Sequence, residues 1–417
     1  MSWMEEHMFL SDCFPKEANI RPACNVINCE VFFKDGLPAA DKVEKLVKGG
    51  CKRSQLGPSA LLSFVRFSAV PDVKSHGWKM VDVDLANHIF TYKPVENRRA
   101  LDAKVDEVAI GLSHVISLYG KSICFRPPLE LSRKDCVVFR CHHTVADGIS
   151  LVQLLDKVAT TPDGKPIKFV NYKAKKAAVQ SSILRKDCIQ LPLRVRSFVS
   201  NLRQAQQPLE TDYGFDAPLS HRSGDMRYSG SRKSICFKPF SLDYVKAIKN
   251  KAPGKITVND VLLGAMDAHT GRCSNRFWGA NPPPEGDRLG NNWSFASADL
   301  SKAIRAEDSV ARVEITDAVM NRLKESLDST TSNFITNKLM PLLPPSKAQH
   351  STKDLYARHT AIFSNVPGPQ LPCCVGGKEI EAVYPIFLTL VEQVIVMSYN
   401  GKFYFNTTPR SKCRDGL

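Results

Sequence analysis

Two adjacent histidines, followed closely by an aspartate and a glycine, are the residues of this chain best suited to proton transfer. They are His142, His143, Asp147 and Gly148, in the pattern H-H-x-x-x-D-G. Histidine accepts and returns a proton near neutral pH, which is the task of a general base. Asp147 can orient an imidazole or pin the loop, and Gly148 can adopt a backbone angle closed to other residues. We predict that this loop carries chemistry.

The residues on either side of the loop predict the elements that hold it. Residues 136–139 form a short apolar run typical of a buried strand, and apolar residues return at helical spacing from Ile149 to Val158. A strand, a polar loop and a helix together hold a base rigidly beside a cavity. The alternative is a pair of surface histidines with Asp147 capping the helix. The whole pattern, however, arises by chance in only about one chain in a thousand of this length.

Two further polar motifs lie in the second half of the chain. In residues 257–261, Thr257 fits a helix N-cap with Asp260 at the third position, an aspartate variant of the capping box, and capping alone explains both residues. Residues 365–369, with the sequence N-V-P-G-P, follow an apolar run and predict a rigid turn.

In order and spacing, the three motifs resemble those of the wax ester synthase/diacylglycerol acyltransferase family, within the coenzyme A-dependent acyltransferase superfamily. Residues 289–291, with the sequence L-G-N, are a supporting match. The resemblance implies an α/β (α+β) fold like chloramphenicol acetyltransferase. In such a fold, two lobes of mixed sheets flanked by helices enclose an active-site channel.

The same resemblance implies an O-acyltransferase with acyl-CoA as co-substrate, no bound cofactor and no metal. The acceptor would be a long-chain alcohol or diacylglycerol, giving wax ester or triacylglycerol. His143 would be the general base, and Asp147 would hold the loop through an ion pair. Asn259 is a candidate donor to the oxyanion. The implied catalytic residues are His143, His142 and Asp147, and the implied substrate-binding or structural residues are Gly148, Asn259, Asp260, Asn365 and Gly368.

Charge and cysteine usage limit the partners and the compartment. The 57 Lys and Arg exceed the 42 Asp and Glu by 15, which suits anionic partners such as coenzyme A or a phospholipid surface. The 13 cysteines form no C-x-x-C pair, which favours a reducing compartment over a zinc ribbon or disulfide framework. No signal peptide or membrane-spanning run is evident. We therefore expect peripheral attachment to the cytosolic face of a membrane, at the endoplasmic reticulum or a lipid droplet in a eukaryote.

The chain divides into two predicted lobes joined by a basic segment. Residues 1–165 form the lobe with the histidine loop, 166–210 the crossover linker, and 211–417 the lobe with the other two motifs. The linker combines many cations with an apolar face from Ile183 to Leu202, so it either lies on an anionic membrane or packs on its own protein.

Other patterns predict the remaining elements. Strands are expected at 24–35, 61–67, 78–90, 234–240 and 293–298, and helices at 41–47, 101–116, 241–250 and 302–340. Asn400-Gly401 between two apolar runs predicts a hairpin.

Three other functions compete with the leading hypothesis. An acyltransferase of the same fold could use another hydroxyl or an amine, and a catalytically silent homologue could bind lipid. The intact His143, Asp147, Asn259 and Asp260 argue against the silent homologue. Nucleic-acid binding would rest on charge alone and ranks last. Walker A, G-x-G-x-x-G, H-E-x-x-H and G-x-S-x-G patterns are missing from the sequence, which argues against NTPase, dinucleotide-binding, zincin and serine-hydrolase functions.

Overall fold

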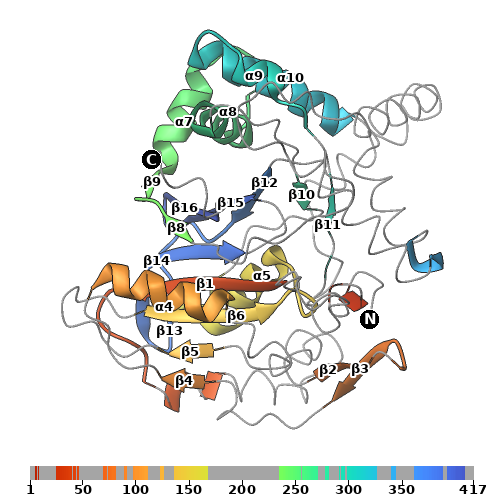
Figure 1. Cartoon of the computed structure of the whole chain (residues 1–417). Helices are drawn as coiled ribbons and strands as arrows, with labels where there is room; N and C mark the ends of the chain where they lie inside the picture. Colours follow the sequence, from red (N-terminus) through yellow and green to blue (C-terminus); the bar gives the residue numbers. More distant parts are fainter. Residues whose placement is uncertain are drawn as a thin grey trace.

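Two stacked β-sheets form the centre of the protein, and helices cover the outer faces (Figure 1). The structure is a computed structural model. It describes residues 5–6, 8, 25–39, 41–43, 45–46, 69–72, 74–80, 89–91, 97–110, 123–125, 136–167, 234–254, 256–270, 278–280, 291, 293–295, 298–325, 340–343, 361–387 and 392–408.

The first sheet contains the strand that leads into the histidine loop. Its order is β4-β5-β6-β1-β14-β13-β7. The strands are β4 (Ile89–Thr91), β5 (Ile123–Phe125), β6 (Cys136–His142), β1 (Val26–Phe33), β14 (Lys378–Phe387), β13 (Cys374–Val375) and β7 (Ala159–Thr160). β4 and β5 run parallel and the other neighbours antiparallel, so the sheet is mixed, as predicted.

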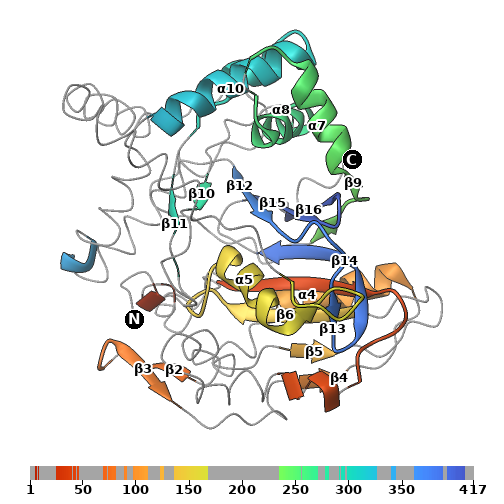
Figure 2. The ribbon, with the colours of Figure 1, turned by 180° about the vertical axis from the view of Figure 1, so that it is seen from behind.

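Helices on both faces explain why β6 is apolar almost throughout. Helix α4 (Arg98–Ile110) packs Leu101 and Val105 against Val138 on one face (Figure 1). Helix α5 (Gly148–Val158) packs Val152 against Val137 on the other (Figure 2). Because side chains alternate along a strand, a strand covered on both faces needs apolar residues at nearly every position.

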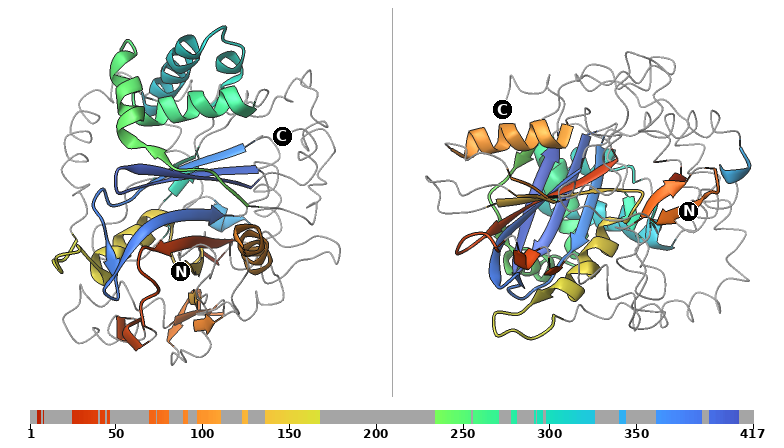
Figure 3. Two further views of the ribbon diagram at one scale, coloured as in Figure 1. Left: turned by 90° about the vertical axis from the view of Figure 1, so that its left-hand side faces the viewer. Right: turned by 90° about the horizontal axis from the view of Figure 1, so that it is seen from below.

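The second sheet lies between the first sheet and a layer of helices (Figure 3). Its order is β12-β15-β16-β8, with β9 also paired to β16. The strands are β12 (Ala361–Pro367), β15 (Glu392–Tyr399), β16 (Lys402–Thr408), β8 (Ile235–Cys236) and β9 (Phe240–Ser241), and the helices are α7 (Leu242–Lys251), α8 (Val258–Thr270), α9 (Ser301–Ile304) and α10 (Ser309–Glu325). One apolar core joins these helices to the outer face of the sheet, and another fills the space between the two sheets.

Three further small elements lie outside the two sheets and the helices named above. β2 (Ala69–Asp72) and β3 (Gly77–Met80) form a hairpin, β10 (Trp278–Ala280) pairs with β11 (Trp293–Phe295), and Met340–Leu342 is a 3-10 turn. Among the helices that the structure describes, none is both long and apolar enough to cross a membrane.

Most local predictions agree with the structure, with corrections to boundaries. The Asn400-Gly401 hairpin joins β15 to β16, and both turn residues have positive φ, 45° and 71°. Helix α4 begins at Arg98, three residues before its expected start. The expected helix at 302–340 is instead two helices, α9 and α10, within the residues described there.

The first sheet also departs from the division of the chain into lobes. Residues 211–417 were expected to build the second lobe, yet their strands β13 and β14 complete the sheet of the first. The boundaries at 165 and 210 stay a prediction. The expected strand at 61–67 and nearly all of the basic linker at 166–210 lie outside the described residues.

Candidate active site

The histidine loop begins where β6 ends and closes at the first turn of α5. His142 is the last residue of β6, and the backbone N–H of Val145 donates to its carbonyl oxygen at 2.9 Å to form a turn. The backbone N–H of His143 donates to the carbonyl oxygen of Asn25 at 2.7 Å. The strand, loop and helix predicted from the sequence are therefore present, and neighbouring backbone fixes the loop.

His143 lies on the face of the first sheet that α5 covers. Its imidazole packs against the Phe387 ring at the end of β14, with ring centroids 5.2 Å apart. Its Nδ1 lies 2.7 Å from Oδ1 of Asn291, and Nδ2 of Asn291 donates to the carbonyl oxygen of Thr144 at 3.2 Å. One asparagine, 148 positions away in the chain, thus holds two consecutive residues of the loop.

Electrostatics around His143 favour the neutral imidazole. Removal of the ring from solvent lowers its pKa below the ordinary 6.5, because a charged imidazolium loses its hydration. The negative charge of Asp147 and the hydrogen bond to Asn291 oppose this effect only in part. At neutral pH the ring is therefore a base, ready to accept a proton.

His142 has a different surrounding. It is only 4% exposed, and its Nδ1 accepts the backbone N–H of Thr144 at 3.1 Å. A ring nitrogen that accepts this bond has no proton, so the bond also fixes the tautomer of His142. The Nδ1 atom of His142 is therefore used within the loop, whereas Nδ1 of His143 contacts Asn291.

Asp147 caps the helix that follows the loop. It is buried, with φ −84° and ψ 170°, and its carboxylate accepts the backbone N–H of Ser150 at 2.8 Å. The cap that the sequence left open as an alternative is thus real. The ion pair implied by the family resemblance stays a prediction.

Gly148 corrects one expectation. Its φ does not lie in the left-handed region, so no special backbone angle requires glycine. The reason is space, because an added Cβ would lie 3.3 Å from Cγ2 of Val366 on β12. Gly148 lets the N-terminus of α5 approach the second sheet closely.

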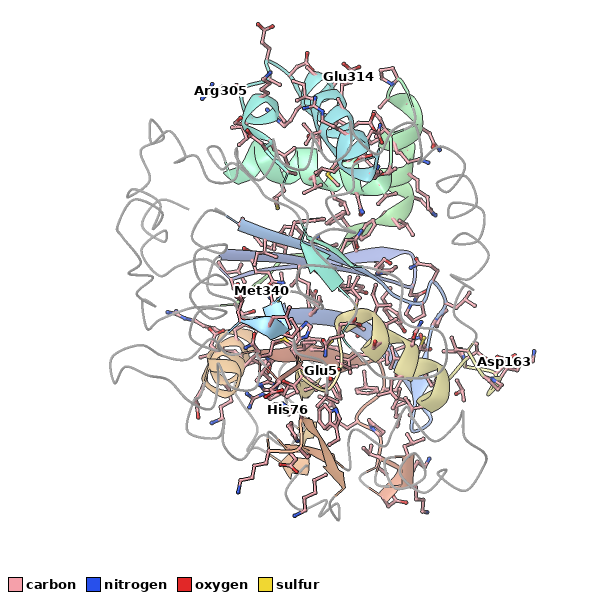
Figure 4. The ribbon with its side chains drawn as sticks, turned by 90° about the vertical axis from the view of Figure 1, so that its right-hand side faces the viewer. Glu5, His76, Asp163, Arg305, Glu314 and Met340 are labelled. Carbon is pink, nitrogen blue, oxygen red and sulfur yellow. The ribbon has the colours of Figure 1, made fainter. Side chains whose placement is uncertain are left out.

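The loop is also tied to the N-terminal residues of the chain. The Thr144 hydroxyl donates to the carbonyl oxygen of Glu5 at 3.1 Å, and Thr144 is fully buried. Figure 4 labels Glu5 next to the N-terminal end of α5. Asn25, Glu5 and Asn291 therefore hold the loop from three separate parts of the chain.

The second and third motifs meet each other on a different face. Nδ2 of Asn365 donates to Oδ1 of Asn259 at 2.6 Å. Because side chains alternate along β12, Asn365 shares a face with Phe363, which packs in the α8 core, while Val366 faces α5. This hydrogen bond places Asn259 beside α8 and β12, and its role as an oxyanion donor stays a prediction.

Asp260 forms one half of the predicted capping box, the bond from the third helical residue back to Thr257. Its Oδ2 accepts the Thr257 backbone N–H at 2.7 Å and the Thr257 hydroxyl at 2.5 Å, and its side chain is fully buried. Lys324 of α10 lies 3.8 Å from the same oxygen. Asp260 thus fixes the start of α8.

The N-V-P-G-P motif is only partly a turn. Asn365, Val366 and Pro367 belong to β12 and pair with β15, so the turn begins at Gly368. An added Cβ at Gly368 would lie 2.3 Å from the carbonyl oxygen of Ser398, and the Gly368 N–H donates to the Ser398 hydroxyl at 3.2 Å. Only glycine fits against β15 at this position.

The described residues include no group of three or more His, Cys, Asp or Glu side chains that could hold a metal ion.

One important residue was missed from the sequence: Asn291 was noted only within the L-G-N match. No local pattern gives an asparagine a contact 148 positions away.

Comparison with known proteins shows what this chain is similar to. The model for the WS/DGAT C-terminal domain matches residues 289–410. The chain is 24% identical over 284 residues to an O-acyltransferase WSD of Acinetobacter baylyi and 23% identical over 315 residues to wax ester synthase/diacylglycerol acyltransferase 6 of Arabidopsis thaliana. These alignments cover 62% and 70% of this chain, and 60% of each relative.

A solved structure supports the fold independently. The wax ester synthase/diacylglycerol acyltransferase of Marinobacter aquaeolei VT8 superposes with a TM-score of 0.58 at 15% identity, over 100% of this chain and 94% of that one. The two-lobed α/β fold predicted from the sequence is therefore confirmed. The family model and the two sequence relatives agree with one another, so the chain is similar to the wax ester synthase/diacylglycerol acyltransferase family.

Proposed function

We propose that this protein transfers a fatty acyl group from acyl-CoA to the hydroxyl of a long-chain alcohol or a diacylglycerol. The observation that carries this proposal is the position of His143: it follows β6 directly, its Nδ1 lies 2.7 Å from Oδ1 of Asn291, and desolvation lowers its pKa. The names of the relatives support acyl transfer to oxygen. The chain aligns with 60% of the length of each relative, so its activity remains a proposal.

The proposed reaction needs a base because an alcohol is too weak an acid to attack a thioester unaided. His143 removes the hydroxyl proton while the alcohol oxygen forms a bond to the thioester carbon. The tetrahedral intermediate then collapses, the carbon–sulfur bond breaks, and the imidazolium returns its proton to the departing thiolate. The products are an ester and coenzyme A, and the enzyme returns to its starting state without a covalent acyl-enzyme.

The proposed partners follow from the substrates. Acyl-CoA is the co-substrate, and the excess of 15 positive charges favours its anionic phosphates. The acceptors are nearly insoluble in water, so the protein meets them at a membrane or lipid-droplet surface, on the cytosolic side. The basic segment 173–203 is the proposed anchor.

A competition assay tests the activity. Purified protein is incubated with labelled palmitoyl-CoA and with hexadecanol and dioleoylglycerol together, and the products are separated by thin-layer chromatography. We expect labelled wax ester, triacylglycerol or both, and loss of both products in His143→Ala. His76→Ala is the matched control, because His76 is exposed on the β2–β3 hairpin. Amide or another ester formed only with a different acceptor would move the proposal to another substrate class, and lipid binding without turnover would overturn it.

Vesicle binding tests the proposed anchor. Changing Arg185, Lys186, Arg194 and Arg196 to Gln should weaken co-sedimentation with anionic vesicles, since each cation contributes about 1 kcal/mol near such a surface. Turnover of a short, soluble alcohol should not change. Salt-independent binding to neutral vesicles, equal in both proteins, would place the anchor elsewhere.

A further inference from the structure

Asn291 makes two hydrogen bonds that together fix the orientation of its side-chain amide. Its side-chain amide lies between Nδ1 of His143 at 2.7 Å and the carbonyl oxygen of Thr144 at 3.2 Å. A carbonyl oxygen only accepts, so the Asn291 NH₂ group must face Thr144. Its Oδ1 therefore faces His143 and accepts a proton from Nδ1.

The direction of these bonds selects one form of the His143 ring. A neutral imidazole carries one proton, and Asn291 holds that proton on Nδ1. The lone pair consequently belongs to Nε2. The opposite tautomer would turn the Nδ1 lone pair toward the lone pairs of Oδ1, an arrangement with no hydrogen bond.

The group that orients Asn291 is itself fixed. The Thr144 backbone N–H donates to Nδ1 of His142 at 3.1 Å, and its hydroxyl donates to the Glu5 carbonyl oxygen at 3.1 Å. Thr144 therefore cannot turn its carbonyl away without breaking bonds to two other residues. The chain of contacts runs from His142 and Glu5 through Thr144 and Asn291 to His143.

We propose that Asn291 is the positioning residue of the active site, fixing the tautomer of His143 so that Nε2 takes the proton of the acceptor hydroxyl. The catalytic role of Nε2 rests on the proposed function, whereas the assignment of the His143 tautomer does not. The inference also means that the base depends on residues from two distant parts of the chain. Asn291 lies within the segment matched by the family's C-terminal domain model, whereas His143 belongs to the N-terminal half.

The groups around His143 allow a test by the sign of an effect. The titratable neighbours that affect its pKa are Asp147, which raises it, and His142, which lowers it; the hydrogen bonds to Asn291 and to the backbone of His143 itself both raise it. Asn291→Leu removes this bond and should lower the pKa of His143. Asn291→Asp keeps an acceptor and adds a negative charge, so it should raise the pKa, by about one unit or more.

The kinetic test compares the acid limb of kcat/KM in the two variants. We expect the limb to move to lower pH in Asn291→Leu and to higher pH in Asn291→Asp, with KM for palmitoyl-CoA unchanged. At its plateau, kcat of Asn291→Leu should fall about tenfold or more, below the ~10⁴-fold loss caused by a wrongly held tautomer in a protease. Asn250→Leu is the matched control, since Asn250 is exposed on α7. The proposal would be overturned if the acid limb of kcat/KM stayed in place in both variants or shifted in the same direction in both. General destabilisation would not shift the two limbs in opposite directions.

A spectroscopic test does not depend on turnover. In ¹⁵N-histidine-labelled protein, the His143 signals are identified by their loss in His143→Gln, and their shifts report which ring nitrogen is protonated. We expect the Nδ1–H form in the wild type and in Asn291→Asp above the pKa, and a mixture in Asn291→Leu. The Nε2–H form in the wild type would overturn the assignment. A wild type with the Nδ1–H form but no acyl transfer would refute the proposed function and leave the role of Asn291 standing.

Discussion

Two polar clusters in this protein use similar side chains for different purposes. The histidine cluster, His143 with Asn291 and Thr144, joins a loop of the first sheet to a distant part of the chain. The asparagine cluster, Asn259 with Asp260 and Asn365, joins the start of α8 to β12. In the first, we propose that one ring nitrogen keeps a lone pair for chemistry. In the second, the hydrogen bonds position a helix and a strand. Two motifs of similar polarity can therefore differ in role, and the hydrogen-bond partners of their side chains distinguish the two roles.

Removal of the base should give the largest difference between the clusters. His143→Gln should reduce the rate of ester formation by about 10²–10⁴-fold, the usual contribution of a general base. The melting temperature should stay close to that of the wild type, because His143 is half-buried and glutamine fills similar space. Rate and melting temperature are measured on the same preparation. A folded variant that keeps more than about a tenth of the activity would contradict the mechanism.

The next largest effect should be a loss of stability when alanine replaces either of two closely packed glycines, and the two losses should differ in size. Gly368→Ala forces a Cβ to within 2.3 Å of the Ser398 carbonyl oxygen, and backbone cannot move aside easily. We expect the free energy of unfolding to fall by about 1–3 kcal/mol, measured by urea denaturation. Gly148→Ala meets only a valine methyl group at 3.3 Å and should cost less. Equal losses would show that contact distance does not decide the outcome.

Substitutions at the two capping aspartates should distinguish the effect of a lost helix cap from the effect of a lost negative charge. Asp147→Ala and Asp260→Ala each remove a helix cap and should lower the free energy of unfolding by about 0.5–2 kcal/mol. Asp147→Asn keeps the cap, because asparagine caps as well as aspartate. It removes the charge that raises the pKa of His143, so only the acid limb of kcat/KM should move, to lower pH. A large loss of stability in Asp147→Asn would indicate an ion pair.

Protonation of His143 should give the smallest effect, a pH dependence of both rate and stability. Burial lowers its pKa below 6.5, so kcat/KM should decline only at more acidic pH. As the pH falls below 6.5, the unfolded chain binds a proton that the native protein still refuses, so the free energy of unfolding decreases down to the native pKa. Subtracting the pH profile of His143→Gln from that of the wild type isolates this contribution. An acid limb above pH 6.5 would be inconsistent with a pKa that desolvation lowers.

Local patterns predicted the histidine loop, the capping box and the Asn400-Gly401 hairpin because each depends on residues a few positions apart. The same reasoning made Asn365 part of a turn, although it pairs with β15 inside a strand. Apolar flanks and a proline do not reveal whether a neighbouring strand is present. The Asn291 contact and the place of β14 were missed for one reason: strand pairing and side-chain docking over 100 or more positions leave no periodicity in the sequence.

The position of β14 determines how this protein can fold during synthesis. β1 pairs on one side with β6 and on the other with β14, which begins 345 residues after β1 ends. At 5–20 residues per second, a ribosome needs roughly 20–70 s to deliver that partner. Until then the β1 edge exposes unpaired N–H and C=O groups, a ready site for pairing with another chain. Expression of the first 210 residues alone should therefore give insoluble protein, and co-expression with a fragment containing residues 361–408 should improve recovery.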